Sequence, residues 1–246
     1  MTIAIAGGTG TLGRRVADEL RSRGHDVRVL SRSSESYPVD LTTGAGLAAA
    51  LEGVDVVVDA ANDASKQAAK VLVEGSRRLL AAEEAAGVGH HVAVSIVGCD
   101  LVPARYLRAK AEQERVVENG PVPWTIVRAT QFHELIEMAL APAARKHVMP
   151  VPRVALQTVA ADDAARAVAD VAEGPPRRQR IEVVGPERHD ARELARTWRA
   201  MTGRRALLLP FPLLPKVGRP LRAGALTAEH PDVRGTVPFE AWLAAR

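Results

Sequence analysis

The pentapeptide YLRAK (106–110) places a tyrosine and a lysine four residues apart. On a helix this spacing puts both side chains on one face, so the ammonium group of Lys110 can lie near the phenol of Tyr106. A free tyrosine has a pKa of about 10, and a neighbouring cation favours its phenolate form. The pair is therefore a candidate for proton transfer, with Tyr106 as the proton donor or acceptor and Lys110 as its helper. The alternative is two solvated side chains at a chance spacing.

A glycine loop lies near the amino terminus, in the segment AIAGGTGTLGRRV (4–16). Gly7, Gly10 and Gly13 form a GxxGxxG pattern between an apolar run and an amphipathic segment. A tight turn and a close approach of the backbone to a pyrophosphate both need residues without a Cβ atom, and the following helix turns its unpaired N–H groups toward the phosphates. The loop therefore predicts a dinucleotide site, the alternative being an ordinary glycine turn.

The end of the second expected strand, RVLSRSS (28–34), indicates which dinucleotide binds. An NAD site carries an acidic residue here, whereas this chain has Arg32 flanked by Ser31 and Ser33. A guanidinium group beside two hydroxyls suits a 2′-phosphate, so NADP(H) is the preferred cofactor and NAD(H) remains possible. The alternative is that Arg32 is an ordinary surface arginine. Four later residues are expected near the adenosine half of the cofactor: Asp40, Ala60, Ala61 and Asn62.

Strand and helix patterns alternate from the amino terminus to about residue 130. The expected strands are 2–7, 25–32, 54–60, 90–98 and 123–129, and the expected helices are 12–24, 46–52, 65–87 and 102–120. Such alternation predicts parallel strands joined by right-handed crossovers. The fold class is therefore α/β, with the doubly wound parallel sheet of the Rossmann fold and a small C-terminal substrate lobe.

The final third of the chain loses this rhythm. It is expected to contain helices at 131–141, 161–173 and 190–202, short strands at 155–159, 181–184 and 205–209, and a proline-rich stretch at 210–220. Residues 1–150 are expected to form the NAD(P)-binding core. Residues 151–246 would supply the remaining sheet elements and the substrate lobe, in a single compact unit. In open α/β folds, ligands bind at the carboxyl ends of the strands.

Composition narrows the function further. The net charge of +4 comes mainly from dispersed arginines, and only 3% of the residues are aromatic, which argues against binding of nucleic acid. No apolar stretch approaches the roughly 20 residues of a membrane span. Cys99 is alone, which favours a reducing, cytoplasmic location, and the scattered histidines predict no metal site. The expected partner is a small-molecule substrate, while the oligomeric state is left open.

The segments GGTGTLG, VLSRS, VVVDAAN, VSIVG, YLRAK and PWTIVRATQFHE together resemble the short-chain dehydrogenase/reductase superfamily. They are most similar to its atypical, NmrA-like NAD(P)H-binding branch, over most of the chain and most strongly over residues 2–135. The resemblance implies a pyrophosphate loop made by Gly7, Thr9, Gly10, Thr11, Leu12 and Gly13. It also implies that Arg32 binds the 2′-phosphate and that Asp40 and Leu41 clasp the adenine.

The same resemblance implies roles around the reacting atoms. Ser95 matches the serine that hydrogen-bonds the substrate carbonyl, and Lys110 matches the lysine that also bonds the nicotinamide ribose. Gln131 and Phe132 match residues that line the nicotinamide and the substrate. His133, in ATQFHE, follows a strand toward the expected substrate cleft, where its alternative is an exposed histidine at a helix start.

These observations predict an NADP(H)-dependent oxidoreductase that transfers hydride to or from a carbonyl-type group of a small organic molecule. Tyr106 would exchange the proton, assisted by Lys110 and Ser95. Two alternatives stay open. One is a non-catalytic NmrA-like regulator that senses the dinucleotide, and the other is an isomerase or epimerase that retains its nicotinamide. The sequence does not predict the substrate.

Overall fold

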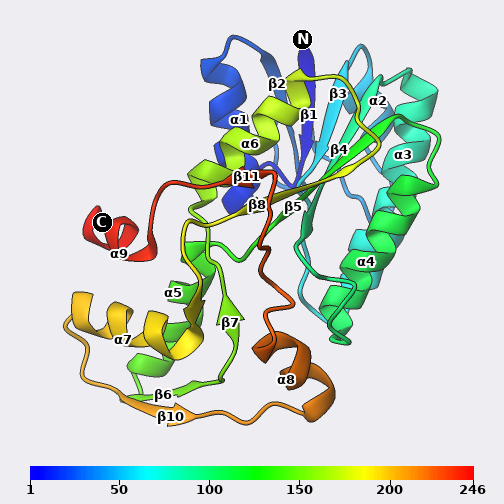
Figure 1. The fold of residues 1–246 in the computed structure, drawn as a ribbon. Helices are drawn as coiled ribbons and strands as arrows, with labels where there is room; N and C mark the ends of the chain where they lie inside the picture. The colour runs from blue at the N-terminus through cyan, green and yellow to red at the C-terminus, as the bar shows by residue number, and fades with distance from the viewer. The chain divides into compact units, whose positions relative to one another are not determined.

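The computed structural model describes all 246 residues, and most of its elements are labelled in Figure 1. The strands are β1 (Thr2–Ala6), β2 (Asp26–Leu30), β3 (Val56–Asp59), β4 (His90–Ile96), β5 (Trp124–Ala129), β6 (Val148–Val151), β7 (Ala155–Leu156), β8 (Arg180–Val184), β9 (His189–Asp190), β10 (Leu207–Pro210) and β11 (Val233–Arg234). The α-helices are α1 (Thr11–Ser22), α2 (Leu47–Leu51), α3 (Gly75–Ala86), α4 (Arg105–Glu118), α5 (His133–Ala144), α6 (Ala161–Glu173), α7 (Ala191–Met201), α8 (Pro215–Arg222) and α9 (Phe239–Ala244). A π-helical turn, η1 (Lys70–Glu74), leads into α3. None of the helices has the length and apolar character needed to cross a membrane.

Seven strands form one sheet in the order β11-β8-β5-β4-β3-β1-β2. β1 pairs in parallel with both β2 and β3, β3 with β4, and β8 with β11. The order of the chain reverses at β1, since β2 lies on one side of it and β3 on the other. The predicted doubly wound parallel sheet is confirmed. Ligands of such folds bind where the strand order reverses, at the carboxyl ends of the strands.

The chain divides into two compact units. The first unit contains Met1–Ser95, Arg105–Arg128 and Ala165–Ile181, and the second contains Ile96–Ala104, Ala129–Ala164 and Glu182–Arg246. The division is discontinuous because the chain leaves the first unit after β5 and returns to it through α6.

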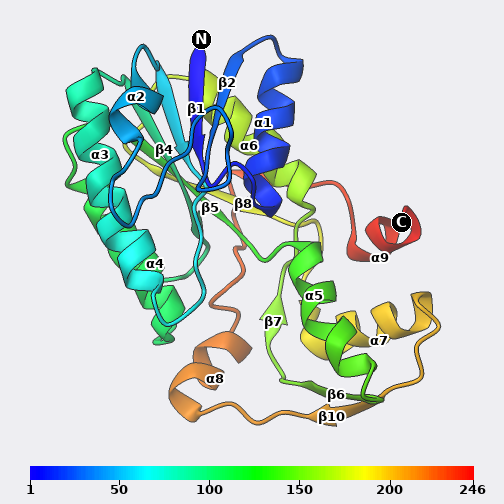
Figure 2. The ribbon, with the colours of Figure 1, turned by 180° about the vertical axis from the view of Figure 1, so that it is seen from behind.

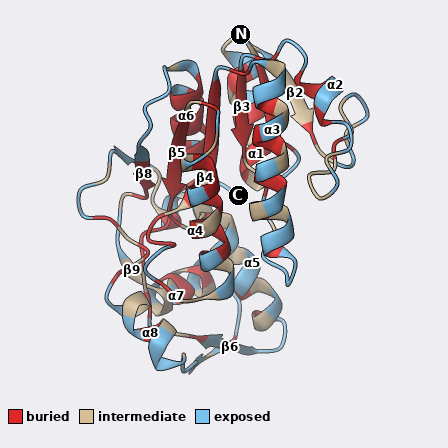
Figure 3. Cartoon of the chain, turned by 90° about the vertical axis from the view of Figure 1, so that its right-hand side faces the viewer, coloured by how far each residue is buried: buried red, intermediate tan, exposed pale blue.

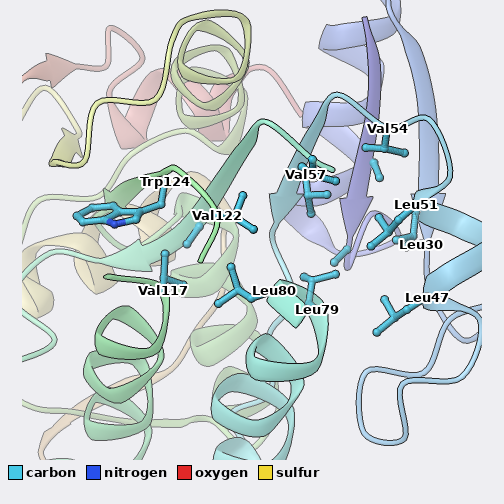
Figure 4. Packing of buried hydrophobic residues seen from close by; sticks show 14 of the residues in the cluster. Leu30, Leu47, Leu51, Val54, Val57, Leu79, Leu80, Val117, Val122 and Trp124 are labelled. Carbon is cyan, nitrogen blue, oxygen red and sulfur yellow. The ribbon is translucent and has the colours of Figure 1, made fainter. Parts of the chain in front are cut away.

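In the first unit, α1 and α6 cover one face of the sheet, and α2, α3 and α4 cover the other (Figures 1 and 2). Every residue of β3 is buried, as expected for a central parallel strand, and the central strands appear red in Figure 3. Leu79 and Leu80 of α3 pack toward the sheet, and Val117 of α4 lies beside Val122 and Trp124 (Figure 4). This apolar contact fixes α3 and α4 against the strands whose ends carry the candidate site.

A buried ion pair fixes the orientation of α4 against the sheet. Arg128 of β5 donates two hydrogen bonds to the carboxylate of Glu114, at 2.8 Å and 2.6 Å, and both side chains are buried. Arg180 joins the cluster through a 2.7 Å ion pair with Glu118. Removing one partner of a buried pair leaves an uncompensated charge, so this pairing holds α4 at one rotation and height against β5.

The second unit has its own core. α5, α7 and the parallel pair of β6 and β10 surround a cluster that includes Leu140, Met149 and Trp198. α7 begins with a capping box, in which Asp190 accepts from the N–H of Arg192 while its own N–H donates to Glu193. Sequence patterns missed β6 and α8, because β6 has only four residues and α8 lies in the proline-rich stretch. Pro215 is tolerated there because the first turn of a helix needs no N–H partner.

The pH dependence of stability should report on His90. This residue is 3% exposed, and burial, together with the neighbouring charge of His91, lowers the pKa of His90 to about 4. The unfolded chain binds this proton near pH 6.5, so the stability is complete above that pH and is lost as the pH falls toward 4. We expect the folded protein to lose about 1–2 kcal/mol through this group between about pH 7 and pH 5.

The measurement is urea unfolding at both pH values. His90→Gln keeps a polar group for the Thr125 hydroxyl, which lies 2.9 Å from Nε2 of His90, and should show a smaller loss between the two pH values. His230→Gln, at an exposed position, is the matched control and should behave as the parent protein does. Equal pH dependence in His90→Gln and the parent would refute the assignment.

Candidate cofactor and catalytic site

The backbone of the glycine loop packs directly against the backbone of the residues that follow β3. Gly7 has a φ of +71°, and a Cβ on it would lie 2.7 Å from Cα of Ala61 and 2.8 Å from the carbonyl oxygen of Ala60. A Cβ on Gly13 would collide with the carbonyl oxygen of Gly7. The Gly7 N–H donates to Leu30 at 3.0 Å. The loop therefore joins the carboxyl ends of β1, β2 and β3, and only glycine permits this approach.

The amino end of α1 suits an anionic ligand. Gly10 is its N-cap, with an extended backbone, no side-chain cap and no acidic residue in the first turn. The N–H groups and dipole of such a helix end favour a phosphate. Thr9 and Gly10 are exposed, whereas Leu12 is buried, so Leu12 could contribute only its backbone N–H. The loop and helix end fit the pyrophosphate of a dinucleotide.

Charged and hydroxyl side chains follow β2. Arg32 is exposed, and the Oγ atoms of its neighbours Ser31 and Ser33 lie 3.3 Å apart. Hydrogen bonds from Thr42 lower the pKa of Asp40, and the positive charges of Arg32 and Lys70 act in the same direction. The N–H and hydroxyl of Thr42 both donate to Oδ1 of Asp40 at 2.8 Å, so this carboxylate also holds its own turn together.

Tyr106 is bound to the end of β3. Its hydroxyl donates to Oδ1 of Asn62 at 2.8 Å, and Asn62 directly follows the alanines on which Gly7 packs. The tyrosine ring is half-buried and lies against Leu72 of η1 together with Ala68 and Ala109. The π-helical turn thus supports the ring, and such turns frequently occur at functional sites.

Lys110 is bound to the end of β4. The side chain is 4% exposed, and Nζ donates to the carbonyl oxygen of Val94 and to Oε1 of Gln113, both at 2.9 Å. Val94 immediately precedes Ser95, which is also buried. Two bonds on one ammonium fix its position, so the first unit brings the Tyr106–Lys110 face of α4 to the same strand ends as the glycine loop.

Three residues of this region escaped the sequence reasoning as individual candidates. Asp59, Ser76 and Gln113 are all buried and hydrogen-bonded to one another around Lys110. A signal existed for two of them. Asp59 is the only charged residue of the otherwise apolar β3, and Gln113 lies three residues after Lys110 on the same helical face.

The candidate substrate residues belong to the second unit. Phe132, the N-cap of α5, is partly exposed, as is Gln131, whose Oε1 is buried without a hydrogen-bond partner. His133 is fully buried, and neither the expected substrate contact nor the exposed alternative describes it. Its Nε2 donates to the carbonyl of Val237 at 3.0 Å, and burial lowers its pKa. The neutral ring then accepts at Nδ1 from the hydroxyl of Thr158 at 3.0 Å.

His133 therefore acts as a core residue, since both ring nitrogens are occupied and the ring packs between Phe239 and Trp242 at 5.4 Å and 5.5 Å. It anchors the C-terminal segment within the second unit. No three His, Cys, Asp or Glu side chains gather where they could hold a metal ion.

The loop geometry predicts the effect of adding a methyl group. Gly13→Ala brings a Cβ against the Gly7 carbonyl, so it should lower the melting temperature and weaken NADPH binding at least about tenfold, as measured by calorimetry. Gly24→Ala is the matched control. Gly24 has a φ of +86° with no atom near its missing Cβ, so the substitution costs about 1 kcal/mol of backbone strain and leaves NADPH binding unchanged. Equal binding by both variants would contradict this role of the loop.

Comparison with known proteins agrees with these features. A family model described as NAD(P)H-binding matches residues 7–175. A (4-alkanoyl-5-oxo-2,5-dihydrofuran-3-yl)methyl phosphate reductase from Streptomyces griseus is 34% identical over 142 residues, which cover 53% of this chain and 48% of that protein. Photosystem II assembly factor Ycf39 from Trieres chinensis is 29% identical over 161 residues, covering 58% and 50%. The match thus spans about half the length of each relative.

An Escherichia coli NADPH-dependent quinone oxidoreductase, solved with NADPH, has the same fold with a TM-score of 0.82, 19% identity and coverage of 99% of both chains. The region matched by the family model contains the glycine loop, Arg32, Asn62 and the Tyr106–Lys110 pair. The predicted NAD(P)H-binding family is confirmed, because its model matches more than half of the chain: this protein belongs to the NAD(P)H-binding family.

Proposed function

We propose that the protein is an NADP(H)-dependent oxidoreductase acting on a carbonyl-type group of a small organic molecule. The observation that carries the proposal is the attachment of Tyr106 to the end of β3 and of Lys110 to the end of β4. Those ends lie beside the glycine loop, where the strand order reverses. The reductase activity named for the Streptomyces relative supports the proposal.

The cofactor contacts follow from the same region. We assign the pyrophosphate to the loop residues Gly7, Thr9, Gly10, Thr11, Leu12 and Gly13. The 2′-phosphate is assigned to Arg32 with Ser31 and Ser33, and the adenosine half to Asp40, Leu41, Ala60, Ala61 and Asn62. Lys110 would hold the nicotinamide ribose. Bound NADPH supplies the hydride for reduction of the substrate.

Tyr106 would supply the proton that the substrate oxygen receives. As negative charge develops on the substrate oxygen, the phenol donates its proton to that oxygen. The ammonium group of Lys110 stabilises the phenolate that results, and the Ser95 hydroxyl donates a hydrogen bond to the same oxygen. Before that step the phenol proton is held by Asn62. Exchanging this acceptor for a substrate oxygen costs about one neutral hydrogen bond, roughly 1 kcal/mol.

The substrate would be held by the second unit. Gln131 and Phe132 remain our candidates, because both are partly exposed and the Gln131 carbonyl oxygen lacks a partner. A ligand donor to that oxygen would remove the cost of a buried unsatisfied acceptor. This pairing favours a substrate that carries a hydroxyl or amide N–H donor.

A second candidate function is that of a dinucleotide-binding assembly or regulatory protein. It is favoured by the 29% identity to Photosystem II assembly factor Ycf39. The two candidates differ in one result. A regulator would bind NADPH tightly and oxidise it with none of a panel of aldehydes, ketones, quinones and imines, whereas the oxidoreductase would turn over at least one class.

Tyr106→Phe should lower kcat by about 10²–10³-fold while leaving the affinity for NADPH within about threefold, since it removes only the exchangeable proton. The measurement is NADPH oxidation with the best substrate of the panel, together with NADPH binding. Tyr37→Phe, at the other tyrosine of the chain, is the matched control and should retain full turnover. Unchanged turnover in Tyr106→Phe would exclude Tyr106 as the proton donor.

Arg32→Ala should weaken NADPH binding about ten- to a hundredfold and NADH binding much less, because a guanidinium–phosphate bond is charge-assisted. Calorimetric titration with each cofactor measures the difference. Arg196→Ala changes a similarly exposed arginine on α7 and should alter neither affinity. Equal weakening of NADPH and NADH by Arg32→Ala would remove the 2′-phosphate from this site.

A further inference from the structure

We infer that Gln113 is a positioning residue for Lys110 and that the buried carboxylate of Asp59 sets the direction in which Gln113 points. The inference rests on the proposed role of Lys110 toward the cofactor and Tyr106. It concerns three buried polar side chains that the proposed mechanism does not otherwise use: Asp59, Ser76 and Gln113.

The three side chains form a continuous path to the ammonium group. Nε2 of Gln113 donates to Oδ2 of Asp59 at 3.0 Å and to Oγ of Ser76 at 2.9 Å. The Ser76 hydroxyl donates to the same Oδ2 at 2.8 Å, and Oδ1 of Asp59 accepts from the N–H of Ala61 at 3.1 Å. At the other end of the amide, Oε1 of Gln113 accepts from Nζ of Lys110 at 2.9 Å.

Donor and acceptor types allow only one arrangement of this path. A carboxylate offers acceptors alone, so the side of the Gln113 amide facing Asp59 must be its NH₂ group. The amide carbonyl then faces Lys110, whose ammonium offers donors alone. If the amide turned over, acceptor would meet acceptor at Asp59 and donor would meet donor at Lys110. The charge on Asp59 therefore orients a group that it reaches only through Gln113.

The neutral link also has a consequence for the charge of Lys110. A carboxylate in direct contact with a buried ammonium would form an ion pair and weaken its field at neighbouring groups. The amide carbonyl holds Nζ without adding a net charge at that contact, and the carboxylate stays one residue farther away. The positive charge of Lys110 thus remains effective on the phenol one helical turn earlier.

The start of α3 ties this path to the tyrosine as well. Leu72, in the π-helical turn, packs against the Tyr106 ring, and Ser76, four residues later, bonds to Asp59. One segment therefore contacts both the tyrosine and the residues that hold the lysine. The segment thus contacts α4 both at Tyr106 and at Gln113. Gln113 therefore fixes Lys110 relative to Tyr106 as well as relative to β4.

An exchange of charge between positions 59 and 113 tests the inference. Asp59→Asn places an amide against the Gln113 amide and favours its reversal, and Gln113→Glu places two carboxylates in contact. Each single variant should weaken NADPH binding and lower kcat by about tenfold. In the double variant, Asp59→Asn with Gln113→Glu, donor faces acceptor again at every contact. It should return the Kd of NADPH to within about threefold of the parent, whereas kcat should stay below that of the parent, because the carboxylate introduced at position 113 now pairs directly with the Lys110 ammonium.

Two further variants guard against a general loss of folding. Gln113→Met fills the same volume without an amide and should raise the Kd of NADPH about tenfold even if the charge variants do not fold. Gln157→Met is its matched control, because Gln157 is a fully buried glutamine of the second unit that bonds to Gly185 and Ala228. It should lower the melting temperature while leaving the Kd of NADPH unchanged.

The outcomes separate this inference from the proposed function. Additive losses of NADPH affinity in the double variant, or parental NADPH affinity in Gln113→Met, would overturn the positioning role of Gln113. A parent protein that binds NADPH and oxidises it with no substrate would overturn the oxidoreductase proposal instead. In that case the series of Kd values still tests the path, because cofactor binding requires no turnover.

Discussion

The close packing of the glycine loop onto the end of β3 is the constraint from which the candidate site follows. Without a Cβ at Gly7, the loop backbone can contact Ala60 and Ala61 directly. That contact draws together the carboxyl ends of two adjacent strands and fixes the start of α1. Asn62, the next residue along the chain, is thereby placed where Tyr106 reaches it. A steric condition at one residue thus determines where the polar chemistry can occur.

Around this point the first unit buries an unusual set of polar side chains. Lys110, Gln113 and Glu114 are consecutive or nearly so on α4, and each is satisfied by partners on a different strand. Buried polar groups are costly unless bonded, so each of them restricts how α4 may rotate or slide. Arg128 binds Glu114 at β5, and Val94 binds Lys110 at β4. The apolar core supplies the stability, and these bonds hold α4 in a single arrangement.

The sequence predicted features that depend on local spacing. The glycine loop, the Tyr106–Lys110 pair and the first five strands are each defined within a few consecutive residues. The alternation of strand and helix patterns was enough to predict the α/β fold. The helix expected at 65–87 also formed, although the π-helical turn at Lys70–Glu74 interrupts it. Such a turn depends on packing against α4, which no local pattern encodes.

Features that depend on distant partners could not be predicted in the same way. Asp59 meets Gln113 only after β3, α3, β4 and α4 have packed, so nothing near either residue indicates the pairing. His133 is similar, because its buried state depends on Phe239 and Trp242, whose segment follows it by about a hundred residues. From the local sequence, a histidine at a helix start is expected to be exposed, and only packing against that distant segment buries it. Burial is a property of the completed core rather than of the motif.

Substitutions on different faces of α4 are expected to have different effects. The face with Tyr106, Lys110 and Gln113 is hydrogen-bonded to the strand ends beside the glycine loop, so changes there alter the positions of the Tyr106 hydroxyl and the Lys110 ammonium. Glu114 turns toward Arg128 instead, and its loss would be felt first in stability. Arg108, on the same helix, is exposed. A substitution on the first face could therefore remove the proposed proton transfer while leaving the Glu114–Arg128 pair intact.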